Sequence, residues 1–275
     1  MPEVPVAFQG ARGAFSEEAV VAHFGETARP LPCRSFAEVF SRVVGGDAHF
    51  GVVPIENSLA GSIHQVYDLL LARDLHIVGE VEIRISHHLI ALPGVKLADV
   101  RRVLSHPQAL AQCQGSLARL LPEAEPVPTY DTAGSAKLLR EEQIRDGAAL
   151  ASRRAAAIYG LAILHGCLED DPENYTRFLV LATSPMEPQG AAKTSLVFSA
   201  KNAPGALHRC LGAFARRGID LTKIESRPLK GKRWQYVFYV DFAGSVHEQR
   251  CRQALEELRG MATFLRVLGS YPRSV

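Results

Sequence analysis

Apolar runs of strand length alternate with amphipathic segments from residue 4 to about residue 182. This alternation is typical of an α/β domain with largely parallel sheets. It predicts strands at 4–8, 50–53, 77–85, 89–92, 103–104, 148–151 and 176–182. It also predicts helices near 62–71, 108–121 and 132–141, in addition to two helices that begin near Ser16 and Ser35.

The first two helix starts carry recognisable capping patterns. Ser16 has the character of an N-cap, and Glu17 and Glu18 follow it in the first turn, where their charges complement the helix dipole. Ser35 and Glu38 have the spacing of a capping box, in which each side chain bonds to the other residue's backbone N–H. We therefore expect one helix to begin at each serine.

A second pattern follows a segment rich in turn-forming residues, 183–190, which we interpret as an interdomain linker. It predicts a strand at 194–199, a helix at 205–217, strands at 221–226 and 235–242, a helix at 247–261 and a strand at 264–270. Ser245 and Glu248 give the last helix a capping-box pattern. This βαββαβ order is that of ferredoxin-like modules, which usually bind ligands or dimerise. We expect a first domain at 1–183, a linker at 184–192 and a second domain at 193–275.

The composition excludes several classes of protein. Hydrophobic residues make up 47% of the chain and charged residues 22%, which is typical of a soluble globular protein and indicates neither disorder nor a fibrous repeat. The formal charge of 31 − 29 = +2 is too small for a nucleic-acid-binding field. The basic residues Lys230, Lys232 and Arg233 lie between two apolar runs, where a solvated hairpin turn explains them. We therefore expect no nucleic-acid partner.

Cysteine usage and the N-terminus bear on the compartment. The five cysteines are scattered and include no C-x-x-C pair, so neither a zinc knuckle nor a redox couple is indicated, and a reducing environment fits. No basic segment followed by an apolar one opens the chain, and no stretch approaches the ~20 apolar residues that span a bilayer. The sequence therefore predicts a cytoplasmic protein with no membrane partner.

Five short polar segments, 8–16, 53–62, 105–112, 132–135 and 174–178, lie at the ends of predicted strands or beside them. In open α/β sheets ligands bind at the carboxyl ends of strands. The first segment contains Gly10 and Gly13, and it fits either an anion site at a helix start or a left-handed glycine turn before an ordinary cap. The second places a carboxylate, an amide and hydroxyls directly after a buried strand, a combination that a plain loop rarely needs.

The other three segments each have a plainer alternative. His106 could act as a general base, although a histidine beside a proline at a helix entry is more often a structural hydrogen-bonding residue. Gln108 and Gln112 share one helix face near the predicted helix start. Segment 132–135 fits a helix cap better than a binding loop. Thr176 and Arg177 stand at a strand entrance, where such residues usually face solvent.

Taken together, these segments resemble the ordered motif set of prephenate dehydratases, and the resemblance covers the whole chain. The motifs are Phe8-Gln9-Gly10 through Ser16, Val53-Pro54-Ile55-Glu56-Asn57-Ser58, Ser105-His106-Pro107-Gln108 and Asn174-Tyr175-Thr176-Arg177-Phe178. The C-terminal module resembles an ACT regulatory domain. Its Pro204-Gly205-Ala206-Leu207 is similar to that family's Gly-Ala-Leu effector motif, and Glu225-Ser226-Arg227-Pro228 matches its Glu-Ser-Arg-Pro motif. Several motifs in the right order are more specific than any one of them.

The resemblance implies a catalytic domain of two α/β lobes around a cleft, similar to type II periplasmic binding proteins, followed by the ferredoxin-like ACT domain. The chain would cross between the lobes near 83–87 and near 158–174. Because no mutase-like helical segment precedes the first strand, we expect the monofunctional form rather than a fusion with chorismate mutase. The resemblance also implies a homodimer or homotetramer with L-phenylalanine bound between ACT domains as an allosteric inhibitor.

The implied reaction is the decarboxylating dehydration of prephenate to phenylpyruvate, CO₂ and water in phenylalanine biosynthesis, with no metal or other cofactor. The residues that carry over as catalytic are Thr176, Asn57, Ser105 and Gln112, with Thr176 as the candidate hydrogen-bond donor to the departing C4 oxygen. Those that carry over for substrate binding are Ser16, Glu56, Ser58, Thr132, Arg177 and Phe178. Those that carry over for phenylalanine are Pro204, Gly205, Ala206, Leu207, Glu225, Ser226, Arg227 and Pro228.

One departure and two alternatives accompany this prediction. The chain has Ala133-Gly134 where many relatives have a hydroxyl residue, which weakens the assignments of Thr132 and Ser135. An arogenate dehydratase would run the same elimination on an amino-acid side chain, and the sequence does not separate the two substrates. A non-catalytic sensor of amino acids or aromatic acids could use the same two domains. The intact Thr176-Arg177-Phe178 argues against that sensor.

Overall fold

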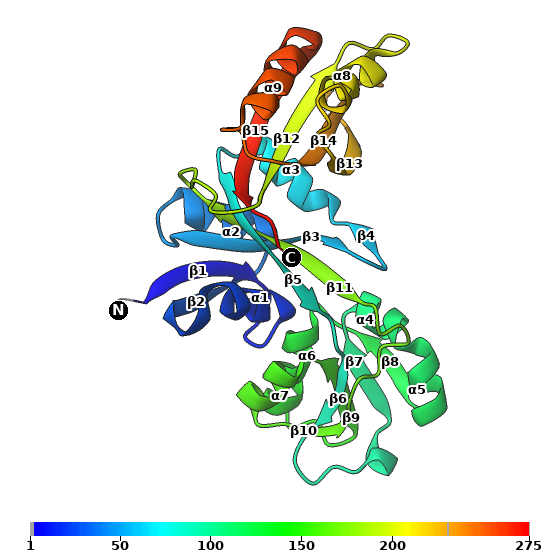
Figure 1. Cartoon of the computed structure of the whole chain (residues 1–275). Coiled ribbons are helices and arrows are strands. Elements are labelled where there is room, and N and C mark those ends of the chain that lie inside the picture. Colours follow the sequence, from blue (N-terminus) through cyan, green and yellow to red (C-terminus); the bar gives the residue numbers. More distant parts are fainter. Residues whose placement is uncertain (1–2, 230, 275) are drawn as a thin grey trace. The chain divides into compact units, whose positions relative to one another are not determined.

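The computed structural model of the chain describes residues 3–229 and 231–274. These residues form two compact units. The first unit comprises the residues up to Leu69 together with Val81–Phe178, and the second comprises Leu70–Glu80 together with the residues from Leu179 onward. Figure 1 shows the helices and strands in chain order, coloured from blue to red. No described helix is long and apolar enough to cross a membrane.

The first lobe is built on a sheet with the strand order β2-β1-β3-β11-β5, and the short strand β4 pairs with β3 (Figure 1). Its elements are β1 (Val4–Gln9), α1 (Phe15–Phe24), η1 (Gly25–Thr27), β2 (Ala28–Cys33), α2 (Phe36–Val44), β3 (Phe50–Asn57), β4 (Gly61–Ser62), α3 (His64–Ala72), β5 (His76–Arg84) and β11 (Tyr175–Ala182). β1 pairs in parallel with both β2 and β3. Because parallel strands end at the same edge of a sheet, Gln9 and Asn57 emerge on the same side of this lobe.

The second lobe is built on a sheet with the order β10-β6-β9-β7-β8. Its elements are β6 (His88–Ala91), η2 (Leu97–Asp99), β7 (Arg102–Ser105), α4 (Pro107–Gln112), α5 (Gln114–Leu120), β8 (Glu125–Pro128), α6 (Thr132–Glu141), β9 (Gly147–Ala151), α7 (Arg153–Tyr159) and β10 (Ala162–His165). β7 is parallel to β8 and β9, whereas β6 is antiparallel to β9 and β10. The sheet is therefore mixed, and its parallel half carries the α4 and α6 helix starts.

Two irregular segments, 85–87 and 166–174, carry the chain from the first sheet to the second and back. They are joined to each other, because the Ile85 N–H donates to the Asn174 carbonyl at 2.7 Å. Two α/β lobes connected by two crossings form the type II periplasmic-binding-protein-like class that the resemblance implied. The predicted fold class of this part of the chain is therefore confirmed.

The helix starts agree with the sequence only in part. Helix α1 begins at Phe15 after the extended residue Ala14, and Ser16 lies buried inside the first turn, so the predicted Ser16 N-cap is wrong. Ser35 does cap α2, because its hydroxyl accepts from the Glu38 N–H at 3.2 Å. The Glu38 carboxylate, however, accepts from the Arg34 N–H at 2.8 Å, so only half of the predicted capping box forms.

Other boundaries differ because tertiary contacts compete with the local pattern. The helix predicted over 108–121 is broken at Cys113 into α4 and α5. The Asp170 carboxylate accepts from the Gly115 and Ser116 N–H groups at 2.8 Å each, which gives α5 a start of its own. Helix α6 spans the predicted residues, but its N-cap is Asp131 rather than a residue of segment 132–135.

The second unit contains the βαββαβ module as β12 (Ala192–Ala200), α8 (Ala206–Ala215), β13 (Leu221–Pro228), β14 (Tyr236–Ala243), α9 (Gln249–Met261) and β15 (Ala262–Pro272). These strands form an antiparallel sheet with the order β13-β14-β12-β15, which confirms the predicted ferredoxin-like fold. The core includes the fully buried side chains of Phe198, Phe214 and Phe242. Burial of each such ring stabilises a fold by about 1.5–3 kcal/mol.

Two details of this module concern earlier predictions. The Ser245 N–H donates to the Glu248 carboxylate at 2.8 Å, but the Ser245 hydroxyl accepts from the His247 N–H, and α9 begins only at Gln249. The second capping box is therefore also half formed. The predicted hairpin around the basic cluster joins β13 to β14, with Lys232 and Arg233 in the connection, whereas Lys230 lies outside the described residues.

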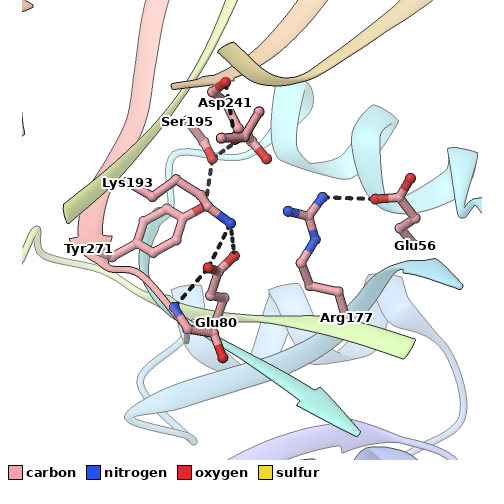
Figure 2. Close-up of polar contacts among 9 residues, drawn as sticks. Glu56, Glu80, Arg177, Lys193, Ser195, Asp241 and Tyr271 are labelled. Atoms are coloured by element: carbon pink, nitrogen blue, oxygen red, sulfur yellow. Dashed lines mark hydrogen bonds and ion pairs between the residues drawn. The ribbon is translucent and has the colours of Figure 1, made fainter. Parts of the chain in front are cut away.

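Polar side chains of the second unit also contact one another, and Figure 2 shows these contacts. The Lys193 ammonium donates to both carboxylate oxygens of Glu80 at 2.7 Å, and the Ser274 N–H donates to the same carboxylate at 3.0 Å. Both side chains of this ion pair are almost completely shielded from solvent. Ser195 links Asp241, at 2.6 Å, to the Tyr271 hydroxyl, at 2.7 Å. These contacts connect β5 with β12, and β12 with β14 and β15.

Candidate active site

A cavity of about 460 Å³ lies within the first unit and is lined from both lobes. The first lobe contributes Gln9, Phe15, Ser16 and Asn57, and the second contributes His106, Gln112, Asp131 and Thr132. The crossing 85–87 and strand β11 complete it with Ile85, His87, Thr176 and Phe178. Most of these residues follow or begin strands, as the sequence predicted for a ligand site in an open α/β sheet. Small-molecule sites typically have largely apolar walls and a few convergent polar groups.

Asn57 and Thr176 form the centre of the polar network. The Asn57 amide nitrogen contacts Thr176 Oγ1 at 2.9 Å, Asn174 Oδ1 at 2.7 Å and the Tyr175 carbonyl at 3.0 Å. Both Asn57 and Thr176 are buried, at 7% exposure each. The end of β3 therefore holds the beginning of β11 in register through one side chain.

The orientation of the Asn57 amide is fixed from its other end. Asn57 Oδ1 accepts from the Leu59 N–H at 3.2 Å and from the Ala60 N–H at 2.9 Å, so the oxygen is engaged by backbone donors and the nitrogen must face β11. Because Thr176 Oγ1 accepts from this amide, its own hydrogen is left to donate elsewhere. A hydroxyl donor is thus positioned at the wall of the cavity.

Gln112 and His87 form a second polar pair at the cavity wall. His87 Nε2 lies 3.1 Å from Gln112 Oε1, and the imidazole contacts the Phe15 ring edge-on with 5.5 Å between ring centroids. His87 is 2% exposed. Burial lowers the pKa of His87 below its ordinary value, and the Gln112 hydrogen bond and the Glu169 charge oppose this shift only in part. The ring is therefore neutral at physiological pH.

Four predicted site residues do not line this cavity, namely Ser105, Glu56, Ser58 and Arg177. The Ser105 hydroxyl is fully buried and donates to the Leu150 carbonyl at 2.7 Å, which ties β7 to β9. Arg177 donates to Glu56 at 2.8 Å, joining β11 to β3. The Ser58 hydroxyl donates to the Glu173 carbonyl and accepts from the Tyr175 N–H at 2.9 Å. These groups hold together the strand ends that carry Asn57 and Thr176.

The remaining predicted residues of this unit, Ser16, Thr132 and Phe178, do line the cavity. His106 lines it as well, but its ring accepts from the Gln108 N–H at 3.2 Å as the N-cap of α4, which is the structural role that the sequence favoured. Phe15, His87, Tyr130 and Asp131 also line the cavity, although none of them was predicted as a site residue. Only Asp131 carried a usable signal, since it immediately precedes a predicted helix and has the character of an N-cap.

The glycine turn of segment 8–16 packs against the second lobe. Gly13 has φ +88°, and a Cβ placed there would lie 2.6 Å from the Ala155 Cα. The Ser152 hydroxyl donates to the Gly13 carbonyl at 2.7 Å. The Gly13 N–H donates to the buried carboxylate of Glu17, which also pairs with Arg12 and, through Arg154, with α7.

The N–H groups of this turn are largely engaged within the protein. Gly10 donates to the Cys33 carbonyl, Ala11 to Asp131 Oδ2, and Ala14 to the Ala11 carbonyl. The structure therefore favours the left-handed glycine turn over an anion site at this position. Its role is to bring Phe15 and Ser16 to the cavity wall.

The predicted effector residues lie in the second unit. Gly205 adopts a left-handed conformation, with φ +73°, as the N-cap of α8, directly after Pro204 and ahead of Ala206 and Leu207. Glu225, Ser226, Arg227 and Pro228 form the last part of the edge strand β13. Both motifs thus occupy element ends of one βαββαβ module.

Metal chemistry requires clustered ligands. Among residues 3–229 and 231–274, no group of three or more His, Cys, Asp or Glu side chains is arranged to hold a metal ion. The polar groups that line the cavity are hydroxyls, amides, imidazoles and the carboxylate of Asp131. Such a site can donate hydrogen bonds to an anionic substrate and to a departing oxygen.

Comparisons with known proteins agree with this picture. The family model described as prephenate dehydratase matches residues 6–186, and the ACT domain model matches residues 194–260. Arogenate dehydratase 2 of Petunia hybrida is 49% identical over 283 residues, covering 97% of this chain and 71% of the relative. The bifunctional chorismate mutase/prephenate dehydratase of Pseudomonas aeruginosa is 42% identical over 270 residues, covering 98% of this chain and 73% of the relative.

Two solved structures are similar over nearly the whole chain. The prephenate dehydratase of Arthrobacter aurescens in complex with L-Phe is 36% identical, with a TM-score of 0.90, and the match covers 98% of this chain and 90% of that one. A protein described as a quorum-quenching acylase is 37% identical, also with a TM-score of 0.90, and the match covers 98% of both chains. Since the dehydratase model spans most of the sequence and the ACT model follows it, the chain belongs to the prephenate dehydratase family and carries a C-terminal ACT domain.

Proposed function

We propose that the protein catalyses the decarboxylating dehydration of prephenate to phenylpyruvate, CO₂ and water. The observation that carries this proposal is the Thr176 hydroxyl, which accepts from Asn57 at 2.9 Å and keeps its own hydrogen for the cavity. Family membership supplies the reaction class. In this reaction the ring loses a carboxylate as CO₂ and the C4 oxygen as water, and it becomes aromatic.

The barrier lies in the departure of the C4 oxygen, because aromatisation makes the overall reaction favourable. The electrons of the breaking C–CO₂ bond flow into the ring and expel the C4 oxygen as hydroxide, which becomes water by taking a proton from solvent. A threonine is a weak acid, so Thr176 acts by a hydrogen bond that strengthens as negative charge develops on that oxygen. A donor of this kind contributes about 10²–10³ in kcat.

The other cavity residues bind and orient the substrate. Gln112 and Ser16 provide polar groups for the carboxylates, and Phe15 and Phe178 provide apolar walls for the ring. Enclosure between the lobes removes water from the ring carboxylate, which favours its loss as CO₂. Ser105, Ser58 and the Glu56–Arg177 pair act behind the wall by fixing strand ends.

A second candidate substrate is arogenate, and Asp131 favours it. The Asp131 carboxylate lines the cavity, where it would attract the ammonium group of arogenate, a positive charge that prephenate lacks. Two curated relatives of high identity are arogenate dehydratases, and another is named for both activities. Prephenate and arogenate differ in this side chain alone, so the same Thr176 chemistry serves both.

The acylase activity that names one structural neighbour is less compatible with this geometry. Amide hydrolysis by a threonine needs a nearby base to take the hydroxyl proton. Thr176 Oγ1 instead faces an amide N–H donor, and the His87 imidazole bonds to Gln112. The hydroxyl is therefore arranged as a donor rather than as an activated nucleophile.

We extend the proposal to domain organisation and regulation. Residues 1–183 form the catalytic domain, 184–192 the linker and 193–275 the ACT domain, which binds L-phenylalanine as an inhibitor between two protomers of a dimer or tetramer. The L-Phe complex of the Arthrobacter aurescens relative supports this regulation. The similarity to the bacterial relative supports a cytoplasmic location. In this proposal no metal or organic cofactor takes part.

The test is a paired assay of the purified protein. Prephenate is expected to give phenylpyruvate, and arogenate to give phenylalanine, each followed with the same enzyme preparation. A higher kcat/KM for prephenate supports the first candidate, and a higher kcat/KM for arogenate supports the second. Asp131→Asn should shift the ratio toward prephenate. Binding of both compounds without turnover of either would overturn the proposal and support a sensor.

A further inference from the structure

His87 lies at the cavity wall beside Gln112 but outside every motif that the resemblance carried over. Its imidazole is 2% exposed, and its Nδ1 is buried with no hydrogen-bond partner among the described residues. Its Nε2 has one partner, the Oε1 of Gln112 at 3.1 Å. A buried polar ring with one bonded nitrogen and one unpaired nitrogen has few acceptable protonation states.

The geometry selects one tautomer. With the proton on Nε2, the ring donates to Gln112 Oε1 and leaves only an acceptor lone pair unpaired at Nδ1. With the proton on Nδ1, a buried N–H donor would be unpaired, and two acceptors would face each other at the Nε2–Oε1 contact. A doubly protonated ring would bury a charge with an unpaired donor. Burial also lowers the pKa of His87, which keeps the ring neutral.

The two residues are held in place by one short stretch of the return crossing. The Leu168 N–H donates to the His87 carbonyl, and the Asp170 N–H donates to the Gln112 carbonyl, both at 2.8 Å. Between them, the Glu169 carboxylate accepts from the His87 N–H at 2.8 Å. Three consecutive residues therefore fix the backbones of both partners, so the contact between the side chains does not depend on a flexible loop.

We propose that His87 is a positioning residue, whose Nε2–H holds the Gln112 carbonyl oxygen so that the Gln112 amide N–H groups face the substrate. This proposal rests on the proposed dehydratase function. A flipped Gln112 would present its oxygen to the cavity, where it would repel a carboxylate of the substrate. His87 therefore determines whether this part of the cavity donates or accepts hydrogen bonds.

The proposal distinguishes variants that keep the donor from variants that lose it. His87→Gln keeps an N–H donor close to the original Nε2 position, whereas His87→Leu removes it and preserves bulk. His87→Leu should lower kcat/KM by roughly fivefold to tenfold, the effect of one hydrogen bond of about 1 kcal/mol, and mainly through a higher KM. His87→Gln should restore most of the loss. In a Gln112→Ala background, His87→Leu should have no further effect on kcat/KM.

A burial-matched control comes from the adjacent residue. His88 is also buried, and its Nδ1 accepts from the Cys167 N–H at 3.4 Å. His88→Asn should leave KM unchanged even if it lowers the melting temperature, because it does not contact Gln112. An equal rise in KM for His88→Asn and His87→Leu would reduce the role of His87 to packing and overturn the proposal.

A measurement without turnover completes the test. The ¹⁵N shifts of the His87 ring in the intact protein should show a proton on Nε2 and none on Nδ1, and a proton on Nδ1 would overturn the proposal even if the enzyme accepted neither prephenate nor arogenate. If the wild type turns over one of these substrates and a folded His87→Leu variant keeps its KM, this inference fails while the proposed function stands. If neither substrate reacts, the proposed function fails, and the tautomer decides the inference.

Discussion

Asn57 Nδ2 lies 2.9 Å from Thr176 Oγ1, although 119 positions of sequence separate the two residues. The contact exists because β3 and β11 are neighbours in the first sheet, with Asn57 ending one strand and Thr176 near the beginning of the other. In this contact the Thr176 hydroxyl oxygen accepts a hydrogen bond, and its own hydrogen is not used. The hydroxyl must therefore donate its proton to something else, and the cavity lies next to it.

The first prediction follows from that donor. Thr176→Ala should lower kcat on the order of 10²-fold with little change in KM, because the bond strengthens mainly in the transition state. Thr176→Ser keeps the hydroxyl and should retain most of the activity. Steady-state kinetics on the preferred substrate measure both. Near-normal turnover by the alanine variant would remove Thr176 from the mechanism.

The second prediction concerns the glycine turn. Gly13→Ala should lower the free energy of unfolding by about 2–4 kcal/mol, because overpacking against the Ala155 backbone adds to the strain of a left-handed conformation. Gly160 is the matched control, since it has φ +61° and open space around its Cβ position. Gly160→Ala should cost only about 1 kcal/mol. Chemical denaturation of both variants tests this, and equal losses would contradict the packing argument.

The sequence predicted the fold class because the order of strands and helices along the chain follows from local hydrophobic patterns. Strands with continuous apolar runs, such as β9 and β11, were found within one residue of their observed starts. Strand β2 was missed because its sequence, ARPLPC, contains two prolines, which suit an edge strand but weaken a strand pattern. The break between α4 and α5 was missed because its cause, Asp170, lies far along the chain.

The sequence motifs predicted only part of the candidate site. Asn57, Gln112 and Thr176 were predicted from the motifs, and the fold brings all three to one cavity, while their catalytic roles stay predictions. Ser105 was assigned through the same motifs, yet its hydroxyl bonds to a sheet carbonyl, which no local pattern could reveal. His87 was missed because a histidine in an irregular crossing segment has no local signature, and its partner Gln112 lies 25 positions further along the chain.

The third prediction is a pH dependence of stability. Burial lowers the pKa of His87 below its ordinary 6.5, so between that value and the folded-state pKa the unfolded chain binds more protons than the folded one. The contribution of His87 to the free energy of unfolding should therefore be complete above about pH 6.5. Below that value the free energy of unfolding should fall as the pH drops. His87→Gln should make that fall smaller. His23 and His88, whose pKa values are also lowered by burial, contribute to the remainder together with carboxylates.

Unfolding curves at pH 7 and pH 5 measure this effect. The comparison between wild type and His87→Gln is the decisive quantity, since carboxylates titrate in both proteins alike. An identical loss of stability in the two would show that His87 is already protonated in the folded state, or that it is accessible to solvent.

The fourth prediction concerns the buried ion pair of the second unit. Lys193→Met should destabilise the protein by about 3–5 kcal/mol, because it leaves the Glu80 carboxylate buried without its cation. The control is Lys137→Met, which removes an exposed pair with Glu141 at 3.6 Å and should change stability by less than about 1 kcal/mol. Thermal or chemical unfolding compares them. Equal effects would indicate that solvent reaches Glu80.

The last prediction concerns regulation by L-phenylalanine. Gly205 has a left-handed backbone with φ +73° at the start of α8, a conformation that a β-branched residue adopts only with strain. Ser226 is exposed on the edge strand β13, where a second protomer can approach. We expect Gly205 to let the effector approach the backbone and Ser226 to form part of the facing wall. Gly205→Val and Ser226→Trp should therefore block the effector site.

An inhibitor acts only through unequal affinity for two states of the enzyme, typically a coupling of ~1–3 kcal/mol, or about 5–150-fold in affinity. Both variants should lose this coupling and retain the kcat of the uninhibited enzyme, since neither residue lies at the cavity. Gly218 is the matched control, because it also has a positive φ, +59°, but no neighbour within 4 Å of its Cβ position and no place in either motif. Gly218→Val should stay sensitive to phenylalanine. Full sensitivity in the Gly205 and Ser226 variants would place the effector site elsewhere, because a side chain added at either position cannot coexist with a ligand in close contact with the backbone.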